Sequence, residues 1–181
     1  MKILIVGDGP GGLSAALFLA KMGLEVDVFG KDETPMHKAM LYNYLGIPEM
    51  TGPEFQRVSR EQVSKFGATL HDVKITEVQH NDGSFAVQTE TGERHEGTHL
   101  ILACGPKKQF AEALGLKAGE EGNIHVERNG QTEIKGLYAI GWTTRANKIQ
   151  AIISAGDGAT AALEILSEKV GKGVHDFDFM D

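Results

Sequence analysis

Residues 3–12 read Ile-Leu-Ile-Val-Gly-Asp-Gly-Pro-Gly-Gly, an apolar run that passes directly into a glycine-rich turn. The four apolar residues 3–6 are typical of a strand buried on both faces of a parallel sheet. An Ala- and Leu-rich stretch follows at 13–22, where Gly23 suits the end of a helix, and residues 24–29 alternate like a second strand. The first thirty residues are therefore predicted to form one strand–helix–strand unit.

The turn contains the pattern Gly-x-Gly-x-x-Gly at Gly7, Gly9 and Gly12. In a dinucleotide-binding fingerprint the first Gly permits the tight turn, the second lets the backbone approach a pyrophosphate, and the third allows close helix–strand packing. The N–H groups and the dipole of the helix that starts near Pro10 and Gly11 would bind the phosphates. Since the motif lies between a strand and a helix, we predict a dinucleotide site rather than a turn that binds nothing.

The fingerprint also calls for an acidic residue at the end of the second strand, where it binds ribose hydroxyls. Gly30 stands at this position, followed by Lys31, Asp32 and Glu33. The ribose could be bound by the backbone of Gly30 or by one of the two carboxylates, which could equally be solvated loop charges. Gly30 and Lys31 are therefore included in the predicted site.

The middle of the chain changes its pattern twice. Residues 31–53 contain three of the five prolines and little periodicity, which predicts a long ordered loop, and residues 53–66 are predicted to form an amphipathic helix. Three alternating segments joined by tight-turn residues follow, at 74–78, 84–89 and 95–100. They predict a three-stranded antiparallel β-meander.

The last third of the chain again alternates apolar, strand-like runs with helical stretches, as the first thirty residues do. The predicted elements are buried strands at 100–103 and 136–141, a short helix at 109–114, a long Ala-rich helix at 149–168 and an acidic tail at 171–181. The predicted organisation is one α/β domain over residues 1–170 followed by this tail. A length of 181 residues is too short for two ordinary domains of about 100–200 residues each.

Composition excludes several classes of function. The formal charge of −7 argues against non-specific nucleic-acid binding, which needs an excess of Lys and Arg. No apolar run reaches the roughly 18–20 residues of a membrane helix, and the first residues do not resemble a signal peptide. We therefore expect a cytoplasmic protein that binds neither nucleic acid nor membrane.

The Cys and His residues of the chain limit the redox and metal chemistry that we expect of it. The single Cys, Cys104, excludes an intramolecular disulfide and a Cys-x-x-Cys redox pair within this chain. The seven His show no metal-ligand spacing, so no metal site is expected.

Several segments, taken in order, resemble the low-molecular-weight thioredoxin reductases and, more broadly, the pyridine nucleotide–disulfide flavoproteins. The resemblance lies in the opening fingerprint, an Asn–Pro–Gly loop with its helix and Phe-Gly-Ala turn, an Ala-Thr-Gly-like strand end and a closing flavin segment. These segments are residues 6–16, 43–55, 65–68, 100–105, 136–141 and 150–158. The resemblance implies a Rossmann-like FAD-binding domain with FAD as the cofactor.

The resemblance also assigns further cofactor contacts. It places Asn43 near the edge of the flavin ring, where an Asx turn in the loop is the alternative role. It places the N–H groups of Gln150 and Ala151 at the N1/O2 region of the ring, where a helix N-terminus stabilises negative charge. The remaining implied contacts are Ala103, Cys104, Gly105, Gly141 and Trp142.

The chain departs from the family in three respects. Only about thirty residues separate Gly105 from Gly136, without a second fingerprint or a Cys, so the family's NADPH domain is not inserted there. The family's closing Gly-Asp is Gly141-Trp142 here, and Ile149 replaces an Arg. Two acidic anchors for FAD, at positions 30 and 142, are therefore missing.

The sequence leaves two interpretations open for Cys104 and for Trp142. Cys104 is a candidate catalytic thiol only if its pKa is lowered and solvent reaches it; otherwise it is a small buried residue. Trp142 either stacks on the cofactor or fills the space of the lost Asp.

The leading hypothesis is an FAD-dependent oxidoreductase that consists of the flavin domain and takes electrons from a redox protein or a small molecule. Two alternatives remain: a non-catalytic dinucleotide-binding module or subunit completed by a partner chain, and an NAD(P)-binding Rossmann protein. A homodimer is expected, because apolar surface around residues 104–106 and 141–142 would otherwise lack a cover.

Overall fold

A five-stranded parallel sheet forms the centre of the computed structural model, which describes residues 1–180. Its strand order is β10-β9-β1-β2-β5. The strands are β1 (Lys2–Val6), β2 (Glu25–Phe29), β5 (Thr69–His71), β9 (His99–Leu102) and β10 (Leu137–Ala139). Because β1 pairs with β2 on one side and β9 on the other, the predicted N-terminal strand is the middle of the sheet.

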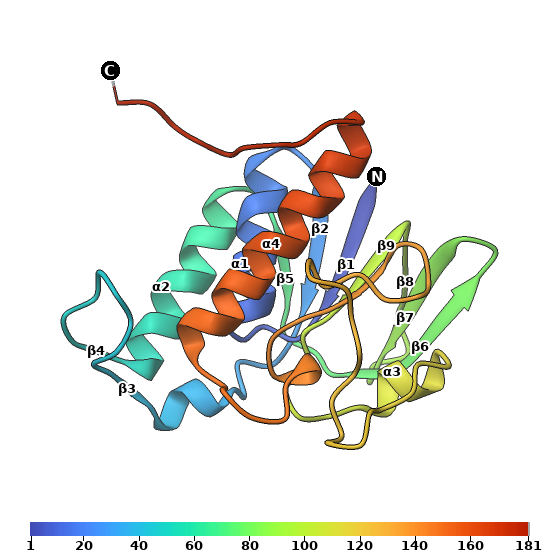
Figure 1. Ribbon diagram of the computed structural model, residues 1–181, viewed down its shortest axis with the longest axis horizontal. Coiled ribbons are helices and arrows are strands. Elements are labelled where there is room, and N and C mark those ends of the chain that lie inside the picture. Colours follow the sequence, from blue (N-terminus) through green and yellow to red (C-terminus); the bar gives the residue numbers. More distant parts are fainter. Residues whose placement is uncertain (181) are drawn as a thin grey trace.

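Helices and a second sheet cover the two faces of the central sheet (Figure 1). On one face lie α1 (Pro10–Lys21), α2 (Gly52–Lys65) and α4 (Ala151–Val170). On the other face lies the antiparallel meander β6 (Ile75–Asn81), β7 (Ser84–Thr89) and β8 (Arg94–Gly97), with the short helix α3 (Gln109–Ala113) beside it. The predicted α/β fold with a three-stranded meander is confirmed.

Side-chain alternation along β1 explains why this strand is apolar throughout. Ile3 and Ile5 belong to the core beneath the helices, whereas Leu4 and Val6 belong to the core beneath the meander. All four side chains are buried. A strand with a packed layer on each face has no solvent-facing positions, so its sequence shows no polar alternation.

The third meander strand ends earlier than the sequence predicts. The segment 95–100 is divided between β8, which pairs antiparallel with β7, and β9, which pairs parallel with β1. A Cβ on Gly97 would lie 2.8 Å from Cγ of Leu4, so the chain passes close to the sheet at this point. β8 is polar (Arg-His-Glu-Gly), as suits a meander strand, whereas β9 is largely apolar (His-Leu-Ile-Leu), as suits a strand of the central sheet.

The predicted loop 31–53 contains short regular elements. They are a 3₁₀ turn at Pro35–Lys38 and a hairpin formed by β3 (Met40–Leu41) and β4 (Met50–Thr51). The edge strand β5 was also not predicted, because three residues are too few to show an alternation. The four predicted helices are present, with boundaries within three residues of those expected.

The C-terminal segment lies partly on the domain. Gly171 ends α4 in a left-handed conformation, and the following chain returns across the helices (Figure 1). Val174 packs against the helix-side core, and Lys21 Nζ lies 2.7 Å from an Asp176 carboxylate oxygen. The acidic tail is therefore anchored on its own chain over this stretch rather than fully solvated. Among the described residues, none of the helices is both long and apolar enough to span a membrane.

Candidate dinucleotide-binding site

The three fingerprint glycines lie at the carboxyl edge of the sheet, where β1 passes into α1. Gly7 has φ +112°, and a Cβ there would overlap the carbonyl of Ala103. A Cβ on Gly12 would overlap the carbonyl oxygen of Gly7, whereas a Cβ on Gly9 would meet no atom within 4 Å. Gly7 and Gly12 are therefore needed for packing, and Gly9 leaves open space in front of the helix.

Two helices begin at this edge without a capping hydrogen bond from a side chain, and they are called uncapped below. Gly9 caps α1 and Gln150 caps α4, in both cases without a side-chain hydrogen bond and without an acidic residue in the first turn. In contrast, Thr51 Oγ1 accepts a hydrogen bond from the Glu54 amide at the start of α2. Helix N-termini leave N–H groups that require an acceptor. The two uncapped helices thus present free donors, and α2 does not.

The first turns of α1 and α4 lie against each other. A Cβ on Gly11 would stand 3.1 Å from the carbonyl oxygen of Ser154, and a Cβ on Gly158 would overlap that of Gly11. Glycine at both positions lets the backbones approach closely. Their positive dipole ends therefore share one edge of the sheet.

The hairpin loop and the start of α4 also meet, as the resemblance implied. The Asn43 side-chain amide donates a hydrogen bond to Gln150 Oε1 at 3.1 Å. The two residues are 107 positions apart in the chain, and both are exposed. Asn43, Gln150 and Ala151 therefore form one group at the α4 N-terminus.

An acidic group does lie where the fingerprint calls for one, and it comes from Asp8. A Cβ on Gly30 would overlap the Asp8 carboxyl group, so the absence of a side chain at position 30 makes room for this carboxylate. Asp8 stands between the first two glycines of the motif and is 5% exposed. Sequence reasoning missed it because the fingerprint places its acid on the second strand. The signal available was a glycine at position 30 together with an acid inside the turn.

Asp8 is held by three neighbours. Its carboxylate accepts a hydrogen bond from the Asp32 amide at 2.9 Å and forms an ion pair with Arg60, which also pairs with Asp72. The side chain of the buried Gln56 donates to the Asp8 carbonyl. Burial raises the pKa of Asp8, and the Asp32 amide and Arg60 partly oppose this shift. Lys31 instead pairs with Glu90 at 3.0 Å and points toward the meander.

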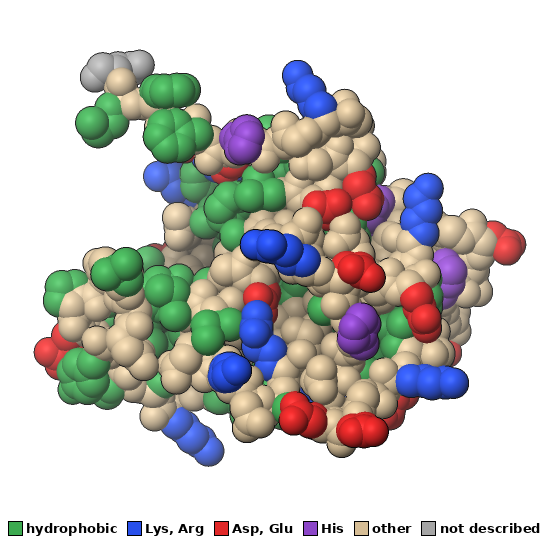
Figure 2. All heavy atoms as spheres, in the orientation of Figure 1, with side chains coloured by type: hydrophobic (Ala, Val, Ile, Leu, Met, Phe, Trp, Pro, Cys, Tyr) green, Lys and Arg blue, Asp and Glu red, His purple; other side chains and the backbone are tan. Residues whose placement is uncertain are grey.

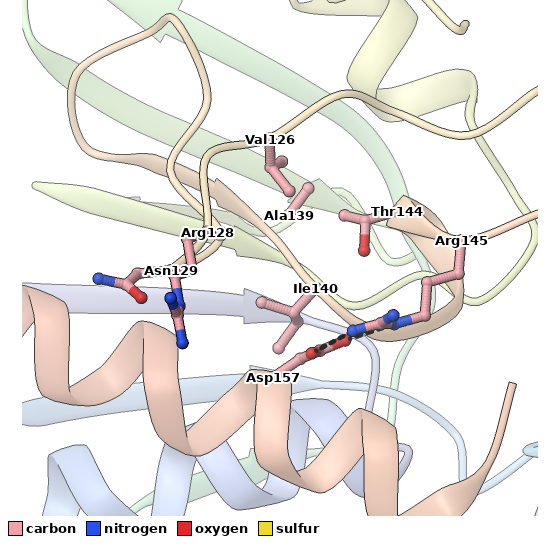
Figure 3. Close-up of a pocket in the computed structure, with 9 residues that line it drawn as sticks. Val126, Arg128, Asn129, Ala139, Ile140, Thr144, Arg145 and Asp157 are labelled. Carbon is pink, nitrogen blue, oxygen red and sulfur yellow. Dashed lines mark hydrogen bonds and ion pairs between the residues drawn. The ribbon is translucent and has the colours of Figure 1, made fainter. Parts of the chain in front are cut away.

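Residues 141–145 are tied to α4 by Asp157, a second acid that the sequence did not predict as a site residue (Figure 3). One Asp157 oxygen accepts hydrogen bonds from the Gly141 amide at 3.2 Å and Arg145 Nε at 3.0 Å, and the other accepts from Arg145 at 2.7 Å. Arg145 and Asp157 border a cavity of about 60 Å³ that Arg128 also lines. Because its oxygens are engaged in this way, Asp157 holds residues 141–145 in place.

Trp142, which is one of residues 141–145, and Cys104 are both partly buried. The Lys108 ammonium donates to the carbonyl oxygens of Trp142 and Thr143 at 3.2 and 2.6 Å. The Cys104 thiol donates to the Val6 carbonyl at 3.4 Å, and burial raises its pKa to about 12. A thiol with this pKa remains protonated at neutral pH, which favours the structural role for Cys104.

Exposed apolar surface was expected around residues 104–106 and 141–142, but of these residues only Pro106 is exposed. Gly141 is buried and Trp142 is half-buried. The exposed large apolar side chains gather instead on the hairpin and on the tail (Figure 2). On these two segments they are Met40, Tyr42, Leu45, Phe177, Phe179 and Met180.

Residues 44–159 match the family described as pyridine nucleotide-disulphide oxidoreductase. This match covers more than half of the chain. The chain belongs to this family. The five-stranded parallel sheet with a three-stranded antiparallel sheet is the arrangement of the FAD-binding domain in this family.

Individual members of the family show similar sequences over part of their length. The chain is 29% identical to ferredoxin–NADP reductase 3 of Lysinibacillus sphaericus over 135 residues, which is 68% of this chain and 38% of that protein. It is 30% identical to the thioredoxin reductase of Aquifex aeolicus over 117 residues, or 62% and 36%. The chain therefore matches little more than a third of the length of either relative.

The fold is similar to that of solved members. A thioredoxin reductase from Gloeobacter violaceus superposes with a TM-score of 0.86 at 18% identity, covering 99% of this chain and 98% of that chain. Identity at this level supports the fold alone.

Proposed function

We propose that this chain is an FAD-dependent oxidoreductase domain that takes its electrons from an external donor. The observation that carries this proposal is the pair of adjacent, uncapped helix N-termini at the carboxyl edge of the sheet. Helix N-termini bind anionic groups through free N–H donors and the positive dipole end. Two such ends side by side suit a cofactor that carries a pyrophosphate and a ring that gains negative charge on reduction.

The residues of this edge fit FAD. The α1 N-terminus, with open space at Gly9, would bind the pyrophosphate. The α4 N-terminus, with Ala151, would donate N–H groups to the flavin ring, and Asn43 would bind the ring edge from the hairpin. Bound flavin supplies the capacity to accept and pass on one or two electrons. The protein's part is to hold the ring and to stabilise the charge that reduction places on it.

Asp8 is proposed to bind the adenosine ribose in place of an acid at position 30. Its carboxylate lies beside Gly30 at the end of β2, which is where the fingerprint acid would stand. The hydrogen bond from Asp32 and the ion pair with Arg60 fix its position before the ribose binds.

The donor is proposed to be a separate redox protein or a small molecule. Between β9 and β10, residues 103–136 form only the short α3 and irregular chain, which leaves no room for a second nucleotide-binding unit there. One relative is named a ferredoxin–NADP reductase and another a thioredoxin reductase. The family therefore includes several donors and acceptors. The alternative to an oxidoreductase is a dinucleotide-binding module without catalysis, or a subunit completed by a partner chain.

The visible absorption spectrum of the purified protein tests the proposal. The expected result is the two absorption bands of oxidised flavin, which bleach when the flavin is reduced chemically or by light. A colourless protein that also fails to take up added FAD would overturn the proposal. A yellow protein whose flavin cannot be reduced would favour the non-catalytic module.

A further inference from the structure

Three side chains with metal-ligating atoms meet between the edge of the central sheet and the meander. Asp27 comes from β2, His71 from β5 and His95 from β8. Their sequence separations gave no metal-ligand spacing, because the residues lie on three strands that only the fold brings together. This cluster shares no residue with the proposed FAD site.

The geometry of this cluster is close to that of a metal site. His71 Nε2 lies 2.9 Å from Asp27 Oδ1, and His95 Nδ1 lies 4.0 Å from Asp27 Oδ2. One ligand atom from each of the three side chains lies within 4.8 Å of the other two. Tetrahedral zinc with bonds of about 2.0–2.2 Å holds its ligand atoms roughly 3.3–3.6 Å apart. A rotation of the His95 side chain and a slight opening of the His71–Asp27 pair would bring the three ligand atoms to these distances.

Burial leaves one nitrogen of the cluster without a partner. The side chains of Asp27, His71 and His95 are 8%, 23% and 19% exposed. Among the described residues His95 Nε2 is buried and accepts or donates no hydrogen bond; its nearest acidic oxygen, on the exposed Glu93, is 3.9 Å away. Leaving a polar atom unpaired in this way costs about 1–3 kcal/mol, and ligation of the ion through Nε2 rather than Nδ1 would remove this cost.

The surroundings hold two of the ligands in place. Lys2 Nζ binds Asp27 Oδ2 at 2.9 Å and also Glu25 at 2.9 Å, so Oδ1 remains directed toward His71. The Phe29 ring stacks on the His71 ring at a centroid distance of 4.7 Å. Ligating carboxylates and imidazoles in proteins are oriented by outer contacts of this kind.

We propose that Asp27, His71 and His95 bind a divalent transition-metal ion of the zinc class, with water in the fourth position. Two imidazoles and one carboxylate are a donor set that zinc accepts. The ion would join the edge strand β5 and its neighbour β2 to the meander strand β8 and so stabilise the contact between the two sheets.

Isothermal titration of the chelator-treated full chain with Zn²⁺ tests the proposal, with Co²⁺ absorption as a second readout. The expected result is one ion per chain, a rise in Tm on binding, and affinity reduced at least tenfold in His71→Gln and in His95→Gln. His125→Gln, which changes an exposed histidine outside the cluster, and Cys104→Ser should bind like the parent chain.

Circular dichroism of each variant shows whether it is folded, and Asp27→Asn provides a third variant if either histidine change unfolds the chain. The proposal is overturned if the parent chain shows no saturable binding. It is also overturned if folded cluster variants bind as tightly as the parent, or if only Cys104→Ser or His125→Gln loses the ion.

Discussion

Gly7, Gly9 and Gly12 are the same residue type in three different surroundings. Gly7 and Gly12 have no room for a Cβ, because the carbonyl groups of Ala103 and Gly7 lie against them. Gly9 has room on every side and an ordinary φ of −77°. Packing therefore explains two of the three glycines, and the proposed pyrophosphate explains the third.

Gly9→Val should abolish FAD binding while the chain stays folded. The added side chain would occupy the space in front of α1, and the loss of a good N-cap residue should lower the free energy of unfolding by about 1 kcal/mol. Flavin content and thermal unfolding of the same preparation measure both effects. Gly12→Val is the contrasting variant and should lose the fold as well. Stoichiometric FAD in soluble Gly9→Val would contradict the placement of the site.

Asp8→Asn should weaken FAD binding about tenfold, because a hydrogen bond to a charged acceptor is replaced by one to a neutral acceptor. Asp72→Asn is the matched control: Asp72 also pairs with Arg60 but is exposed, and this variant should bind FAD like the parent.

Since burial raises the pKa of Asp8, the affinity for FAD should begin to fall at a higher pH than for an ordinary carboxylate as acid is added. Fluorescence titration over a pH series measures both; equal affinities for the two variants would exclude the ribose role.

At the scale of elements, the contact between α1 and α4 positions the two helix N-termini. Both helices are rich in Ala and Gly along this contact, and Ala15, Ala161 and Ala162 are buried there. Small side chains let two helix backbones approach closely enough for both N-termini to reach one ligand. Any side chain added at the crossing should separate them.

Gly158→Ala and Gly156→Ala test this contact within a single helix. A Cβ at position 158 would overlap the Gly11 carbonyl oxygen, so this variant should lose about 1–3 kcal/mol of unfolding free energy and bind FAD more weakly. A Cβ at position 156 would meet nothing, so the better helix former should add about 0.5–1 kcal/mol. Denaturant unfolding of both variants provides the comparison. A Gly158→Ala variant as stable as the parent chain or more stable would show that the crossing tolerates a methyl group.

At the scale of the whole molecule, the relay of a thioredoxin reductase is incomplete in this chain. Such a relay passes electrons from NADPH to flavin, then to a Cys pair and a substrate disulfide. The chain has one Cys, and its thiol is buried with a raised pKa. A single thiol has no resolving partner in the same chain.

We expect no NADPH-dependent reduction of thioredoxin by the isolated 181-residue chain, even when it is fully loaded with FAD. Photoreduction of the bound flavin should still proceed, because the ring site depends on α4 and the hairpin. A coupled assay with NADPH and thioredoxin, run beside photoreduction, measures both. Turnover above about 1 s⁻¹, the low end of typical enzyme rates, would reveal a nucleotide site elsewhere in the chain.

We also expect a homodimer, formed through the exposed apolar side chains of the hairpin and the tail (Figure 2). Leu45 is 90% and Phe179 86% exposed, and exposed apolar surface of this kind is typical of interaction sites. Light scattering at micromolar concentration should give twice the chain mass, and Leu45→Asp with Phe179→Asp should halve it. Met22→Ser, at another exposed apolar residue, should leave the mass unchanged. A monomeric parent chain would contradict the expectation.

Local structure can be predicted from the sequence of this chain alone. The apolar run before the fingerprint predicts the central strand, the three glycines predict the turn, and the alternating segments predict the meander, since each of these signals lies within a few residues of the element that it describes. The order of such segments was also sufficient for the family. The hydrogen bond from Asn43 to Gln150 fits the group that the resemblance implied.

The way in which distant residues combine depends on the tertiary structure. It placed Asp8 in the space left by Gly30, brought Asp27, His71 and His95 together from three strands, and gave β9 a different sheet from β8. Strand order and register set these contacts, and neither is written in the local pattern of any single segment. A fingerprint specifies its turn through backbone conformation, whereas the acid that completes the site depends on which side chain the packing brings alongside.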